Sequence, residues 1–174
     1  GAAVTGNVFT TGAPTGLFVV AGGINDTLSS TEKILDLAVA DFDLDGDLDY
    51  AALRGDGVVE IRSGLGTGSF TLYDVSGALT SAVALAVGRM DTDAYPDLVL
   101  IHDSGGGSID SISVFLNDGT GAFGAAPDST RTTANSDYAD VVLADYNRDG
   151  VLDVVVGEKD GGGVRRLTGR LGSA

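Results

Sequence analysis

The sequence predicts an all-β fold, and three observations support this prediction. Glycine accounts for 27 of the 174 residues, about twice its ordinary share of ~7%, which indicates many tight turns. The apolar runs, such as Ile34 to Ala40 and Leu98 to Ile101, are short, and such lengths suit strands better than helices. Tryptophan is absent and aromatic residues form only 6% of the chain. The core must therefore be built from Val, Leu, Ile and Ala.

Two sequence signatures recur along the chain. The first is a Gly-x-Phe turn with steps of 52 and 53 residues, carried by Gly16, Gly68 and Gly121 and by Phe18, Phe70 and Phe123. The second is an acidic cluster at 41–49, 89–97 and 145–153, with steps of 48 and 56 residues. A glycine-rich insertion at 103–111 lengthens the second repeat and explains the unequal steps. Self-similarity at this period indicates a repeat architecture.

Each repeat is expected to contain four short antiparallel strands. The first precedes the acidic cluster (34–40, 83–87 and 141–144) and the second follows it (50–53, 98–101 and 154–156). The third lies at 58–62, 112–116 and 164–167, and the fourth begins at the repeated phenylalanine. Four such strands in about 50 residues describe one blade of a β-propeller. Kelch and WD-type blades fit less well because they depend on tryptophan.

The repeats divide a single domain into about 3.3 blades of about 52 residues. Residues 1–28 are expected to end a preceding blade, 29–79 and 80–132 to form two blades, and 133–174 to form an incomplete one. Closed propellers use about 4–8 blades. We therefore expect a partial propeller that either belongs to a larger one or is completed by self-association, with the strand at Phe18 completing the third blade of a neighbour.

The charge and residue usage exclude several function classes. The 25 acidic and 10 basic side chains give a formal charge of −15, which argues against a nucleic-acid partner and an anionic membrane surface. No apolar stretch approaches the ~20 residues of a membrane helix. The absence of cysteine excludes disulfides and thiolate metal sites. His102 is the only histidine, so a Ser-His-Asp set would depend on it alone as the base. A lone histidine at a strand end is more often structural, and we expect no enzymatic activity.

The first acidic loop has carboxylates at positions 1, 3, 5, 7 and 9 of nine residues, with Gly46 at position 6: Asp41, Asp43, Asp45, Asp47 and Asp49. Such a crowded, oxygen-rich set suits Ca²⁺, which takes 6–8 oxygen ligands. We expect side-chain ligands at positions 1, 3, 5 and 9 and the backbone carbonyl of Asp47 at position 7.

The third loop keeps this pattern. It carries Asp145, Asn147, Asp149 and Asp153 at the side-chain positions, Gly150 at position 6 and Val151 at position 7. A valine fits the carbonyl role because its side chain cannot bind a metal. An EF-hand is the rival interpretation, but it requires glutamate at position 12 and a following helix. Position 12 is Ala52 in the first loop and Val156 in the third, both in β-like runs.

The second loop departs from the pattern. Arg89 stands at position 1 and Ala94 at the glycine position, which leaves only Asp91, Asp93 and Asp97 as carboxylates. We expect the guanidinium of Arg89 to pair with these carboxylates in place of an ion. The chain should therefore bind about two Ca²⁺ ions, with the second loop metal-free or at most a third, weak site.

Two motifs together carry a family resemblance. The pattern Asp-x-(Asp/Asn)-x-Asp-Gly-x-Leu-Asp, combined with the Asn-Asp-Gly-Thr-Gly-Ala-Phe-Gly-Ala-Ala-Pro run at 117–127, resembles the FG-GAP/VCBS repeats of integrin-α-type β-propellers. The resemblance covers nearly the whole chain. It implies calcium in the hairpin between the first two strands of a blade, with the metal positions at Asp41, Asp43, Asp45 and Asp49 and at Asp145, Asn147, Asp149 and Asp153.

The resemblance also implies a function. It predicts a secreted or cell-surface, non-catalytic module for adhesion or recognition of a protein or glycan ligand. Three alternatives remain open: a carbohydrate-binding lectin, a non-catalytic appendage of a larger secreted enzyme, and a purely structural calcium-stabilised repeat. A glycan array would separate the lectin from a protein-adhesion module.

Overall fold

Among the residues that it describes, the computed structural model contains thirteen strands and no helix. The described residues are 8–11, 18–21, 31–67, 69–75, 79, 81–104, 109–134, 137–159 and 163–167. None of their elements is a helix that could cross a membrane. The all-β prediction is therefore confirmed.

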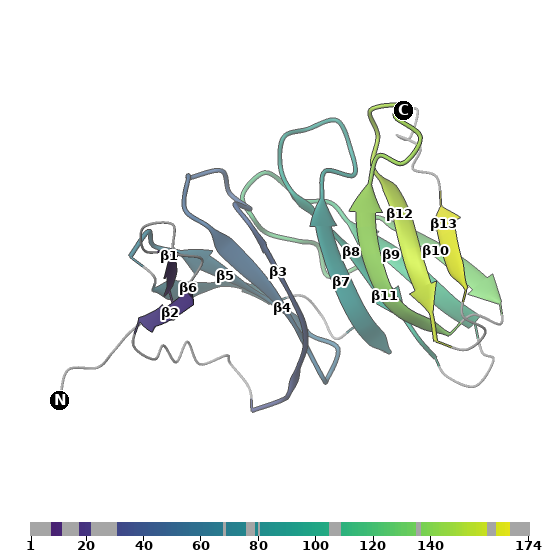
Figure 1. Cartoon of the computed structure of the whole chain (residues 1–174), viewed down its shortest axis with the longest axis horizontal. Helices are drawn as coiled ribbons and strands as arrows, with labels where there is room; N and C mark the ends of the chain where they lie inside the picture. Colours follow the sequence, from purple (N-terminus) through teal and green to yellow (C-terminus); the bar gives the residue numbers. More distant parts are fainter. Residues whose placement is uncertain are drawn as a thin grey trace.

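Three antiparallel sheets follow one another along the chain (Figure 1). We call them the first, second and third blades. The first contains β3 (Ile34–Ala40), β4 (Asp49–Arg54), β5 (Val59–Gly64) and β6 (Phe70–Val75). The second contains β7 (Ala82–Gly88), β8 (Asp97–His102), β9 (Ile109–Phe115) and β10 (Ser129–Ala134). The third contains β11 (Tyr138–Ala144), β12 (Asp153–Glu158) and β13 (Val164–Leu167), and a separate hairpin contains β1 (Val8–Thr11) and β2 (Phe18–Ala21).

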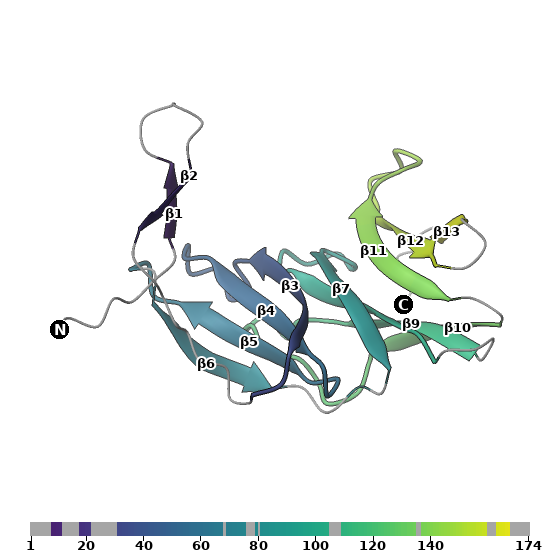
Figure 2. The same cartoon turned by 60° about the horizontal axis from the view of Figure 1, so that its bottom comes forward.

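The sheets confirm the propeller-like blades in an open arrangement. In each blade the strands pair with their sequence neighbours, and β3, β7 and β11 lie side by side (Figures 1 and 2). The described sheets form a row and no closed ring, which fits a partial propeller. The bounds of the four predicted segments remain a prediction.

One strand prediction is wrong. The fourth strand of the second blade begins at Ser129 and not at Phe123. Phe123 forms only an isolated bridge with Asn117, and its buried ring meets Phe42 edge-on at 5.6 Å. The phenylalanine of this repeat therefore serves the core between two blades, since its side chain gains more by burial there than by starting an outer strand.

Alternate residues of β8, the strand next to the inner strand of the second blade, pack against opposite neighbours, as the period of a strand requires. Leu98 and Leu100 of β8 join a core with Ala51 and Leu53 of the first blade. The intervening residues of β8, Val99 and Ile101, join a second core with strands of the third blade, including Val154 and Val156 of β12. Because β8 is covered on both faces, it is buried throughout, which explains its continuous apolar sequence.

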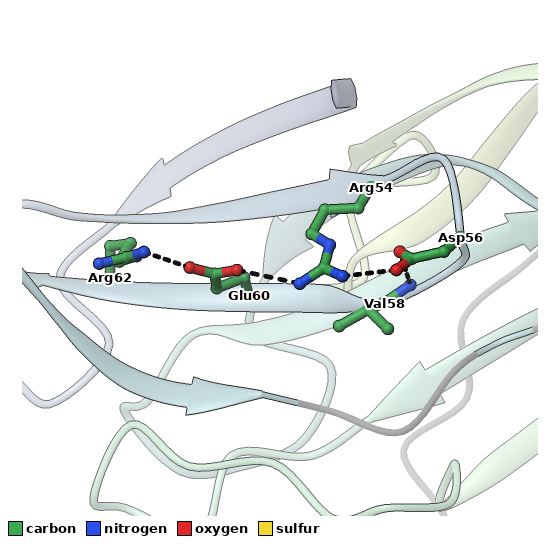
Figure 3. A network of polar contacts seen from close by, with 5 residues as sticks. All are labelled: Arg54, Asp56, Val58, Glu60 and Arg62. Carbon is green, nitrogen blue, oxygen red and sulfur yellow. Dashed lines mark hydrogen bonds and ion pairs between the residues drawn. The ribbon is translucent and has the colours of Figure 1, made fainter. Parts of the chain in front are cut away.

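The first blade carries a charged network on the face turned away from the second blade. Glu60 is fully buried and pairs with two guanidiniums, Arg54 Nη1 at 3.2 Å and Arg62 Nη2 (Figure 3). Arg54 also pairs with Asp56 at the turn after β4. At the corresponding positions the second blade has Ser113 opposite Leu100 and Phe115 opposite Leu98. The two blades thus differ in chemistry on equivalent faces.

Candidate metal sites in the acidic loops

The loop between β3 and β4 folds around its own carboxylates. The N–H of Asp45 donates to Asp41 Oδ1 at 3.1 Å and to Asp43 Oδ1 at 3.2 Å, and the N–H of Gly46 donates to Asp41 Oδ2 at 3.0 Å. The N–H of Asp47 donates to Asp45 Oδ1 at 2.8 Å. These bonds partly offset the repulsion among five carboxylates.

The chain reverses in this loop through two left-handed residues. Leu44, at position 4, has φ 57°, and Gly46, at position 6, has φ 97°. Glycine adopts this region without the steric cost that other residues pay. A Cβ on Gly46 would meet no atom within 4 Å, so backbone conformation and not space selects glycine there.

The loop between β11 and β12 repeats this geometry. Asp149 N–H donates to Asp145 Oδ1 at 3.1 Å and to Asn147 Oδ1 at 2.9 Å, and Gly150 N–H donates to Asp145 Oδ2 at 2.9 Å. Val151 N–H donates to Asp149 Oδ1 at 2.9 Å. Positions 4 and 6 are again left-handed, with φ 61° and 89°. The first and third loops therefore share their backbone path and their pattern of hydrogen bonds.

The aspartate at position 9 has the same place in all three loops. Its Oδ2 accepts the N–H of position 2, with distances of 2.7 Å for Asp49, 2.6 Å for Asp97 and 3.1 Å for Asp153. All three side chains are buried. In the first two loops Oδ1 also accepts an N–H from the end of the third strand, from Gly64 at 2.8 Å and Asn117 at 2.9 Å. This residue ties the loop to the body of its blade.

Burial perturbs two of these carboxyls. Desolvation raises the pKa of Asp49 and of Asp97 above the ordinary aspartate value, although the backbone hydrogen bonds to each lower it. A cation beside Asp49 would relieve this cost because it stabilises the charged form.

The second loop lacks the left-handed turn. Among the described non-glycine residues positive φ values occur at Leu44, Ser81 and Arg148, and so not at Thr92 or Ala94. Asp93 N–H still donates to Asp91 Oδ1 at 2.9 Å, but position 1 offers no carboxylate to accept the N–H groups of positions 5 and 6. The loop keeps its attachment through Asp97 and loses the centre of the acidic cluster.

Arg89 does not make the expected ion pair. Its side chain is exposed, and the described part of the chain contains no ion pair between it and the carboxylates of the second loop. Arg89 instead lines a groove of about 380 Å³ between the second and third loops, together with Asp91, Thr92, Asp93, Gly150, Val151 and Leu152. An exposed pair would gain little over hydration by water.

Three carboxylates of the first loop converge. One oxygen each from Asp41, Asp43 and Asp49 lie within 4.8 Å of one another. Such hard oxygen donors fit a Ca²⁺ ion, whose ligand distances are about 2.3–2.6 Å. The Asp47 carboxylate lies elsewhere, since a Cβ on Gly66 would stand 2.7 Å from its Oδ1 and Oδ2. This placement leaves position 7 to contribute through its carbonyl if it binds at all.

Sequence reasoning missed the part that Asn117 plays. Its buried side chain donates from Nδ2 to Phe42 O at 2.8 Å and Pro96 O at 3.1 Å. Its Oδ1 accepts the N–H groups of Gly119 and Gly121, both at 3.0 Å. The residue thus connects the glycine turn of the second blade to two acidic loops. The motif at 117–127 named this residue, but only the tertiary structure reveals its contact with Phe42.

A second group of carboxylates lies at the opposite end of the blades. One oxygen each from Asp103, Asp110 and Asp137 lie within 4.8 Å of one another. Lys159 Nζ forms an ion pair with Asp103, and the buried Asp110 accepts the N–H of Ser104 at 2.9 Å. No motif spacing connects these residues in the sequence. Their local pairing favours a structural contact between the second and third blades.

The comparison with known families agrees with this geometry. Residues 89–156 match the family model described as FG-GAP-like repeat. The chain carries an FG-GAP-like repeat. The match spans the second and third acidic loops, and the antiparallel sheets that contain them make the chain a β-propeller repeat module. Curated proteins include no significant match.

Proposed function

We propose that this FG-GAP-like chain is a non-catalytic calcium-binding module for adhesion or recognition outside the cell. Two Ca²⁺ ions would stabilise the first and third loops. The observation that carries the calcium proposal is the shared geometry of these loops, in which positions 1, 3, 5 and 6 have the same hydrogen bonds. The adhesion or recognition role rests on the FG-GAP-like repeat.

The proposed ligand sets are the sequence-predicted ones. In the first loop they are Asp41, Asp43, Asp45 and Asp49 with the carbonyl of Asp47. In the third they are Asp145, Asn147, Asp149 and Asp153 with the carbonyl of Val151. The second loop, without a carboxylate at position 1, is proposed to bind calcium weakly or not at all.

Position 3 offers matched variants for testing calcium binding. Asp43→Ala and Asn147→Ala each remove a proposed ligand, whereas Asp91→Ala removes the same position from the second loop. Isothermal titration should give two ions for the parent chain and for Asp91→Ala, and one ion for each of the other variants. The parent melting temperature should fall on chelation, because a ligand at 100 times its Kd adds about 2.7 kcal/mol to the free energy of unfolding.

Two outcomes would contradict the calcium proposal. One is a melting temperature that chelator leaves unchanged, and the other is an equal loss of ions in Asp91→Ala. The recognition proposal has a separate readout, because a glycan array and a screen of extracellular protein domains distinguish a lectin from a protein-adhesion module. Binding to neither would favour a purely structural repeat.

A further inference from the structure

The third blade exposes a surface that the other two blades bury. Val164 pairs with Gly157 in the register where Ile112 pairs with Ile101 and Val59 with Leu53. Val59 and Ile112 are 1% and 4% exposed, because the next blade covers them, whereas Val164 is 74% exposed. The blade thus carries an apolar residue at an interface position without a neighbour over it.

Two more residues extend this surface. Tyr146, at position 2 of the third loop, is 68% exposed, whereas Phe42 at position 2 of the first loop is 1% exposed and packs on Phe123 of the next blade. Val142 is 54% exposed at the register position of Ala38 and Ala86, both of which pack on a core. We call Asp140, Val142, Tyr146 and Val164 the trailing surface.

Asp140 adds a polar feature of the same interface. In the first blade Asp36 accepts its neighbour Leu37 N–H on Oδ1 at 2.8 Å, and its Oδ2 accepts Leu85 N–H from the inner strand of the second blade at 2.9 Å. Asp140 occupies the equivalent register position and accepts Val141 N–H on Oδ1 at 2.8 Å. Its exposed side chain places the second oxygen where a following inner strand would lie.

The first blade exposes the matching half of this interface on its opposite side. Leu37, Val39 and Leu48 are 57%, 63% and 65% exposed, and we call them the leading surface. The equivalent residues of the third blade pack on the second: Val141 is 5% exposed, and Leu143 and Leu152 lie against Gly88. The outer part of this face, with Glu60 and Arg62, is already buried. The inner strand and loop are the part that remains open.

We propose that the occupant of both surfaces is a second copy of this chain, joined head to tail. The trailing surface of one copy packs on the leading surface of the other. The argument is continuity, because the same register positions already pack on each other at both blade interfaces within the chain. Two such contacts related by a twofold axis close a dimer in which each copy supplies its three described blades, and six blades lie within the range of about 4–8 that propellers use.

The net charge sets one condition for this association. Each copy carries −15, so the two copies repel at long range. At about 0.15 M salt the Debye length is about 8 Å, so the repulsion between the copies is screened beyond that distance. Under these conditions the apolar contact determines whether the two copies associate. The observations that carry the inference are side-chain exposure and strand register, and none of them depends on a bound ion.

The test uses one charged substitution on each surface. Leu37→Asp disables the leading surface and Val164→Asp the trailing one, and each should weaken association at least about 100-fold because it buries an unpaired charge. Light scattering of the parent chain should give twice the 17.5-kDa chain mass. Each variant alone should be monomeric, while their equimolar mixture should form a one-to-one pair through the single intact contact.

The control and second variants guard against misfolding. Thr132→Asp changes an exposed residue of β10 in the middle blade and should leave the dimer intact. Leu48→Asp and Val142→Asp replace either main variant that fails to give a parent-like circular dichroism spectrum. A monomeric parent chain, an open series of larger oligomers, a single variant that still dimerises, or a mixture that fails to pair would each overturn the proposal.

Discussion

Replacing Glu60 by glutamine removes the central negative charge of the buried network in the first blade and tests how much this charge contributes to the free energy of unfolding. Glu60 lies between Arg54 and Arg62 and pairs with both, and it is fully buried while each guanidinium side chain is 9% exposed. Removing one member of a buried ion pair costs about 3–5 kcal/mol, because a charge remains buried without its partner. Glu60→Gln should therefore lower the free energy of unfolding by about that amount.

The assay is urea or thermal unfolding of the parent chain and the variant. For a chain of this size about 1 kcal/mol corresponds to about 2–4 °C, so the melting temperature should fall by about 6–20 °C. Asp56→Asn is the matched control: it also removes a carboxylate from Arg54, but its side chain is 36% exposed, and such pairs contribute about 0–1 kcal/mol. A Glu60→Gln variant as stable as Asp56→Asn would refute the reasoning.

Three further predictions concern turns and loops. Gly64→Ala should destabilise the chain by about 1–3 kcal/mol, because its Cβ would stand 2.3 Å from a backbone oxygen, whereas Gly157→Ala, with nothing within 4 Å, should be nearly neutral in the same urea titration. Asn117→Ala should cost at least about 2 kcal/mol by thermal unfolding, since four hydrogen bonds are lost. Hydrogen bonds from the Thr120 side chain and backbone lower the pKa of Asp118. The contribution of this carboxylate to stability is therefore present above the ordinary aspartate pKa of about 3.9 and is lost as pH falls through the lowered value. Asp118→Asn should flatten the plot of the free energy of unfolding against pH in that acid range, and an unchanged plot would contradict this.

The first two strands of each blade were predictable because they lie in short apolar runs bounded by turn residues, whereas β10, with the polar sequence Ser-Thr-Arg-Thr-Thr-Ala, gave no such signal and its start was predicted wrongly. Val99 and Ile101 alternate with Leu98 and Leu100, and all four belong to one middle strand. The acidic loops were equally predictable, because the spacing of their acidic positions is contained in nine consecutive residues. The calcium content of these loops remains a prediction, because the backbone path of a loop does not by itself show which ion binds there.

Other features depended on contacts distant in sequence. Glu60 and Arg62 look like the solvated side of a strand, and only the fold reveals that they are buried together. Phe123 repeats the spacing of Phe70 yet enters a core beside Phe42. Arg89 offered a charge complementary to its loop, but the exposed position removes the energetic reason for pairing.

The three acidic loops separate two roles that one sequence motif combines. Position 9 accepts the N–H of position 2 in every loop, including the second, which lacks a carboxylate at position 1. Closing the hairpin therefore depends on this aspartate and not on a full ligand set. Position 1 distinguishes the loops, because its carboxylate accepts the N–H groups of positions 5 and 6 in the first and third loops, whereas the N–H of position 5 donates to position 3 in all three. If calcium binds as proposed, chelation should lower the melting temperature of the chain by ligand linkage while each loop remains attached to its blade. Loss of the aspartate at position 9 should damage even the second loop.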